Sequence, residues 1–98
     1  MTNREMNETM VEAMKDFPSI ISERIFEKDA NVTKYIAPGA YIEVYPTDFM
    51  VNTKAGDPMC AVKTARLHEV GIGKVRDGWY LFIYLKGADD DFFNVKIS

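Results

Sequence analysis

The sequence predicts an α+β domain in which one or two N-terminal helices pack on a twisted antiparallel sheet of about four to five strands, ending in a β-meander. Three observations lead to this prediction. Apolar residues recur at helical spacing near the start of the chain, and short segments rich in Tyr, Val, Ile and Phe alternate with turn residues after residue 31. The length of 98 residues gives room for one hydrophobic core. We therefore expect a single domain over 1–98, helical over 1–29 and mainly β over 31–98.

The first helix is predicted to begin after Thr2. Thr2 and Glu5 have the spacing of a capping box, in which the hydroxyl and the carboxylate each accept a backbone N–H. The apolar residues of one helical face follow at three- and four-residue steps: Met6, Met10, Val11, Met14 and Phe17. Pro18 ends this helix, because the residue before a proline avoids the α region. Pro18 also suits the first turn of a second helix, which we predict over 18–28.

The strands are predicted from β-prone runs that turn residues separate. They cover residues 40–45, 49–53, 72–76, 79–86 and 92–97. The Asp77-Gly78 pair favours a tight hairpin between the third and fourth of these runs, because both residues tolerate positive φ.

Residues 58–70 allow two predictions. A helix is indicated by its start and stop signals: Asp57 suits the N-cap, Pro58 the first helical position and Gly71 the residue after the end. Lys63, however, would fall in the middle of the apolar face of that helix. The balance favours a helix here, with a strand as the alternative.

Composition excludes several classes of protein. The net charge of -3 and the pI near 5.1 argue against a duplex-DNA binder, which needs a basic face to neutralise phosphates. The longest apolar run, Trp79 to Leu85, spans seven residues, far short of the roughly 18 that a membrane helix needs. A single cysteine and an N-terminus without a secretion signal predict a protein of the reducing cytoplasm.

The motifs that carry chemistry are incomplete. His68 is the only histidine, and with Cys60 it makes no zinc-binding spacing. The Gly-Ile-Gly-Lys run at 71–74 is followed by Val75 and continues into a strand, whereas a phosphate-binding loop needs two glycines five residues apart and a Ser or Thr after the lysine. The acidic run Asp89, Asp90 and Asp91 lacks the spacing of a calcium loop, which leaves a solvated turn or an acidic docking patch. We therefore predict a non-catalytic protein without cofactor or metal.

The run at 79–86 has two distinct faces, because side chains alternate across a strand. Trp79, Leu81, Ile83 and Leu85 form one face, and Tyr80, Phe82 and Tyr84 form the other. Tyr41 and Tyr45 make a similar face on the earlier strand, so that aligned strands would gather these rings on one side of the sheet. Three interpretations follow: a core covered by the helices, a protein-binding surface, or a stacking platform for single-stranded nucleic acid.

We favour a small acidic protein that acts by binding another protein through Tyr41, Tyr45, the 80–84 rings and the 89–91 acids. Inhibitors, immunity proteins and adaptors of phages and other mobile elements share this size and charge. Single-stranded nucleic-acid binding through the same aromatic face is the alternative. The Met6, Met10 and Met14 stripe also leaves room for a homodimer.

Overall fold

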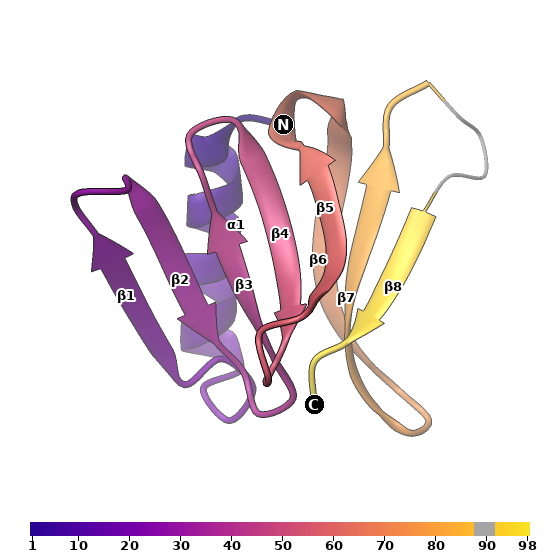
Figure 1. The fold of residues 1–98 in the computed structure, drawn as a ribbon. Helices are drawn as coiled ribbons and strands as arrows, with labels where there is room; N and C mark the ends of the chain where they lie inside the picture. Colours follow the sequence, from indigo (N-terminus) through magenta and orange to yellow (C-terminus); the bar gives the residue numbers. More distant parts are fainter. Residues whose placement is uncertain (88–91) are drawn as a thin grey trace.

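The computed structural model describes residues 1–87 and 92–98, and it confirms the α+β class (Figure 1). In these residues one α-helix precedes eight strands, which form a five-stranded and a three-stranded antiparallel sheet. The helix is α1 (Asn3–Asp16). The first sheet has the order β1 (Glu23–Glu27), β2 (Val32–Ile36), β3 (Ala40–Val44), β4 (Asp48–Thr53) and β5 (Pro58–Lys63). The second is the predicted meander of β6 (Leu67–Val75), β7 (Gly78–Leu85) and β8 (Phe92–Lys96).

Helix α1 forms as its sequence predicts. The Thr2 hydroxyl accepts the Glu5 backbone N–H, and the Glu5 carboxylate accepts the Thr2 N–H, so both halves of the capping box are present. The helix ends at Asp16, one residue short of the Phe17–Pro18 step. Its core-facing residues are Met6, Met10 and Ala13.

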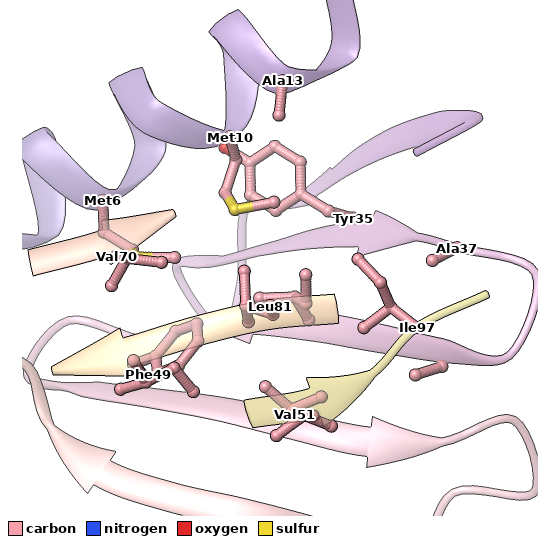
Figure 2. Close-up of a cluster of buried hydrophobic side chains, with 14 of the residues drawn as sticks. Met6, Met10, Ala13, Tyr35, Ala37, Phe49, Val51, Val70, Leu81 and Ile97 are labelled. Carbon is pink, nitrogen blue, oxygen red and sulfur yellow. The ribbon is translucent and has the colours of Figure 1, made fainter. Parts of the chain in front are cut away.

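One hydrophobic core lies between α1 and the inner faces of both sheets (Figure 2). Helix α1 contacts β3 and β6, one strand from each sheet. Alternate residues of the strands point inward. The largest fully buried ones include Tyr35, Phe49, Ile42, Leu81, Ile83 and Ile97. Burial of each such side chain stabilises the fold by about 1.5–3 kcal/mol, so the shared core joins the two sheets into one unit.

The predicted second helix over 18–28 is wrong. Residues 23–27 form β1, which pairs antiparallel with β2 through a turn at 28–31. Asn31 adopts a positive φ of 52° in this turn, and its N–H donates to the Lys28 carbonyl. Asparagine tolerates this left-handed conformation, so the β-prone Ile25-Phe26 step can fold back onto β2.

The predicted helix over 58–70 is also wrong, and the alternative prediction of a strand is correct for most of this segment. The segment forms β5, a short 3₁₀ turn at Thr64–Arg66 and the start of β6. In β5, Cys60 and Val62 pack against the core, while the exposed Lys63 pairs with Asp48 at 3.0 Å. A helix would have placed Lys63 against the core, whereas strand alternation turns it to solvent. Pro58 is tolerated because β5 is an edge strand.

The hairpin at Asp77-Gly78 is present, but its turn lies one residue earlier than predicted. Arg76 and Asp77 form the turn, and Gly78 begins β7 opposite Val75. Gly78 has a φ of +153°, and a Cβ there would lie 2.3 Å from the Ser98 carbonyl oxygen. Glycine therefore serves the close approach of two backbones here.

No helix in the described part of the chain is long and apolar enough to cross a membrane.

Candidate functional site

The outer face of β7 carries the three predicted aromatic rings. Leu81 and Ile83 are fully buried on the inner face of this strand, and α1 packs on that same side. Tyr80, Phe82 and Tyr84 point the other way and lie outside the core cluster; Tyr80 and Phe82 are half-buried, and Tyr84 is 40% exposed. The interpretation in which the N-terminal helices cover these rings is therefore wrong. We call Tyr80, Phe82 and Tyr84 the aromatic face.

Two glycines of β6 lie beside this aromatic face. Gly71 is the cross-strand partner of Phe82, and Gly73 is the partner of Tyr80. A Cβ on Gly73 would lie 3.2 Å from Phe82 Cε2, whereas a Cβ on Gly71 would meet nothing within 4 Å. The Phe82 ring therefore leans over the bare backbone at Gly73, and Gly71 leaves open space next to it. The backbone at Gly71 therefore borders the Phe82 ring with open space above it.

Carboxylates stand at both ends of the aromatic face. The Tyr80 hydroxyl is 2.8 and 2.9 Å from the two carboxylate oxygens of Asp77. This hydrogen bond raises the pKa of Tyr80 and lowers the pKa of Asp77. Lys96 Nζ lies 3.6 Å from the same carboxylate. At the other end, Glu69 is the cross-strand partner of Tyr84.

The structure does not bring Tyr41 and Tyr45 to the aromatic face, because β3 belongs to the other sheet. Both side chains are half-buried in a polar group around Glu43. Glu43 accepts hydrogen bonds from the Tyr45 hydroxyl at 2.8 Å and from Asn52 Nδ2 at 2.6 Å, and the first of these raises the pKa of Tyr45. Lys34 Nζ lies 3.9 Å from the centroid of the Tyr41 ring. Lys34 covers one face of the Tyr41 ring and Glu43 holds Tyr45, so these tyrosines belong to a polar surface that is separate from the aromatic face.

The remaining candidate residues make no reactive centre. Cys60 is half-buried, and desolvation raises the pKa of its thiol, while His68 is exposed. Within residues 1–87 and 92–98, no group of three or more His, Cys, Asp or Glu side chains is arranged to hold a metal ion. The predicted acidic patch Asp89, Asp90 and Asp91 lies outside the described residues.

Sequence reasoning missed a second exposed surface, on β1. Phe26 is 57% exposed and Ile25 is 38% exposed, and a groove of about 730 Å³ separates Phe26 from helix α1. The sequence predicts a helix over 18–28, and a helix there has no strand edge to pair with a partner. The turn residue Asn31 between two β-prone runs, 24–26 and 32–36, is the signal that indicates a hairpin here.

No protein-family model matches the chain, and no curated protein or solved structure matches it significantly.

Proposed function

We propose that this is a non-catalytic protein that acts by docking another protein on the aromatic face. The observation that carries the proposal is the placement of Tyr80, Phe82 and Tyr84 on the side of the β6–β8 sheet that faces away from the core. Aromatic residues are enriched in the centres of protein interfaces, because they bury a large area while losing little conformational entropy. A few such residues carry most of the binding energy of a typical interface, which suits a cluster of three rings.

The shape of the surface supports a protein partner. The open space at Gly71 lets a partner's backbone approach the edge of the Phe82 ring. Rings that lie against strand backbone are held in place before binding, so docking would order few additional side chains. Tyr84 adds the most accessible of the three rings.

The charges beside the rings favour a protein over single-stranded nucleic acid. A nucleic acid that stacked on Tyr80 and Tyr84 would bring phosphates close to Glu69 and to Asp77, whose charge Lys96 offsets in part. Binding of phosphates usually relies on neutralisation by Lys and Arg, and the chain as a whole carries a net charge of -3. A basic or neutral protein surface would meet these carboxylates at lower electrostatic cost.

The proposal includes a reducing, cytoplasmic setting. Cys60 is the single cysteine of the sequence, and its thiol is partly shielded against the core. An inhibitor, immunity protein or adaptor would each use a surface of this kind, and the identity of the captured partner distinguishes them.

Site-specific photo-cross-linking tests the proposal. A photoreactive phenylalanine analogue replaces Tyr84 in one sample and Tyr41 in a matched control, because both tyrosines lie on outward sheet faces but belong to different sheets. We expect the probe at position 84 to cross-link a discrete protein from the native host and the probe at 41 not to do so. Equal products at both positions, or products at 84 that nuclease treatment removes, would contradict the proposal.

A further inference from the structure

We infer that β1 binds an extended segment of a different protein, which adds an antiparallel strand to the sheet and places side chains in the groove beside helix α1. This surface belongs to the five-stranded sheet and is separate from the aromatic face, so the inference goes beyond the proposed function.

The groove arises because β1 extends past the helix (Figure 1). Arg24 and Phe26 pair with Tyr35 and Thr33, whose side chains are buried beneath α1, so Arg24 and Phe26 face the helix side of the sheet. No further strand fills the space between them and α1 in the described chain. The walls include Arg4, Glu8 and Val11 of the helix and Arg24, Phe26 and Thr33 of the strands. The volume of about 730 Å³ is within the range of ligand-binding clefts.

The outer edge of β1 is open to pairing. Within residues 1–87 and 92–98, β1 pairs with β2 alone, and all five of its residues are exposed. Proteins usually blunt such edges with a proline, a bulge or a charge. The edge strand β5 has Pro58 and a register shift at Val51/Asn52, and β6 has a register shift at Leu67/Glu69. Strand β1 carries charges at Glu23, Arg24 and Glu27, but it has no proline and pairs with β2 in unbroken register, which leaves a regular backbone template for a strand of complementary charge.

The side chains of β1 indicate the chemistry of the partner. Phe26 is 57% exposed on the groove side and Ile25 is 38% exposed on the opposite side, so an apolar residue is favoured opposite each. Arg24 forms no salt bridge with any described carboxylate, lines the groove and is the cross-strand partner of Tyr35. An acidic side chain opposite Arg24 would complete this site. Glu23 and Glu27 favour basic residues opposite them.

The same charges disfavour a second copy of this chain. In a two-fold symmetric antiparallel pair of identical strands, cross-strand partners lie on the same face of the sheet. Because side chains alternate between faces, the two residue numbers of each pair must be both odd or both even. Pairing centred on Ile25 sets Glu23 against Glu27 twice, and pairing centred on Phe26 sets Arg24 against Lys28 twice. Pairing centred on Arg24 sets that guanidinium against itself. Every short symmetric register therefore opposes like charges, which destabilises a strand pair. The edge is complementary to a different sequence.

A synthetic peptide tests the inference. Its core is Lys-Val-Ile-Glu-Lys, flanked by serines, which places the five residues opposite Glu27, Phe26, Ile25, Arg24 and Glu23 in an antiparallel strand. NMR titration of the ¹⁵N-labelled protein is expected to shift the amides of β1 and of the groove-facing helix residues at peptide concentrations up to about 1 mM. A peptide with N-methyl groups along one edge cannot complete the ladder and is expected to bind at least about tenfold more weakly.

Charge exchange gives the sharpest control. The peptide Glu-Val-Ile-Lys-Glu is expected to bind the native protein at least about tenfold more weakly, and R24E to shift the preference toward that peptide. Tyr84→Ala should leave both affinities unchanged, because the aromatic face lies on the other sheet; failure of one proposal therefore does not imply failure of the other. The inference is overturned if β1 amides do not respond, if N-methylation has no effect, or if the native protein is a dimer that Phe26→Ala converts to monomers.

Discussion

The Tyr80 hydroxyl donates to the Asp77 carboxylate, with oxygen–oxygen distances of 2.8 and 2.9 Å. This contact ties the first ring of the aromatic face to the β6–β7 turn, and Lys96 on β8 approaches the same carboxylate at 3.6 Å. The orientation of Tyr80 is thus set by three segments of the meander, so that a partner would meet a ring that is already fixed.

Removal of this hydroxyl should change the titration of Asp77. The Tyr80 hydrogen bond is the largest cause of the lowered pKa of Asp77, so Tyr80→Phe is expected to raise that pKa toward the usual range of an exposed aspartate. In the native protein, the contribution of this bond to stability is present above the pKa of Asp77 in the unfolded chain. It is lost as the pH falls through the lower pKa of the folded chain. NMR titration of the Asp77 carboxyl carbon measures the change, with Tyr84→Phe as the matched variant; an unchanged Asp77 pKa in Tyr80→Phe would contradict the assignment.

The two faces of β7 should respond differently to truncation. Ile83 is fully buried, so Ile83→Ala is expected to lower the free energy of unfolding by about 2–5 kcal/mol. Tyr84 is 40% exposed on the outer face, so Tyr84→Ala is expected to cost less than about 1 kcal/mol. Urea denaturation followed by Trp79 fluorescence measures both values. Equal losses would mean that Tyr84 belongs to the core.

Tyr35 should stabilise the contact between α1 and β2. Its ring is fully buried, and its hydroxyl donates to Asn7 Oδ1 at 2.5 Å. Tyr35→Phe leaves this acceptor without its donor and is expected to cost about 1–3 kcal/mol in the free energy of unfolding. Tyr41→Phe is the control, because the Tyr41 ring rather than its hydroxyl contacts Lys34. A smaller loss for Tyr35→Phe than for Tyr41→Phe would contradict the proposed role of the hydroxyl.

The Cys60 thiol should react slowly. Desolvation raises its pKa, and the thiolate is the nucleophilic form, so the rate of alkylation by iodoacetamide near neutral pH should be below that of a free cysteine. Addition of denaturant should bring the rate up to that of the free amino acid. Fast alkylation in the folded protein would show that the β5 edge opens readily.

The sequence predicts the helix and the strands that alternate clearly. The capping box at Thr2 and Glu5 and the methionine spacing locate α1, because both signals are local. The two faces of β7 are predicted correctly, because aliphatic residues such as Leu81 alternate with aromatic residues such as Tyr80 along the strand. Strand β1 has no such signal: all five of its residues are exposed, so no alternation is imposed by a core, and Pro18 fits the start of a helix equally well.

The arrangement of the site is harder to predict. The division of the strands into two sheets depends on the 3₁₀ turn at Thr64–Arg66, where the chain leaves one sheet and starts the next. The local sequence at this turn contains no glycine or proline. Tyr41 and Tyr80 both alternate with apolar neighbours, so the pattern alone cannot show that they lie on different sheets. The groove beside β1 likewise depends on where α1 ends relative to the sheet edge.

The affinity of a captured partner shows whether the aromatic face is the docking surface. Once cross-linking at position 84 identifies a protein, isothermal titration calorimetry compares its binding to the native chain, to Phe82→Ala and to the control Tyr41→Ala. We expect Phe82→Ala to raise the Kd by about thirtyfold or more, as for a central interface residue, and Tyr41→Ala to leave it unchanged. An unchanged Kd for Phe82→Ala, in a variant that melts at the native temperature, would contradict the claim that this face binds the partner.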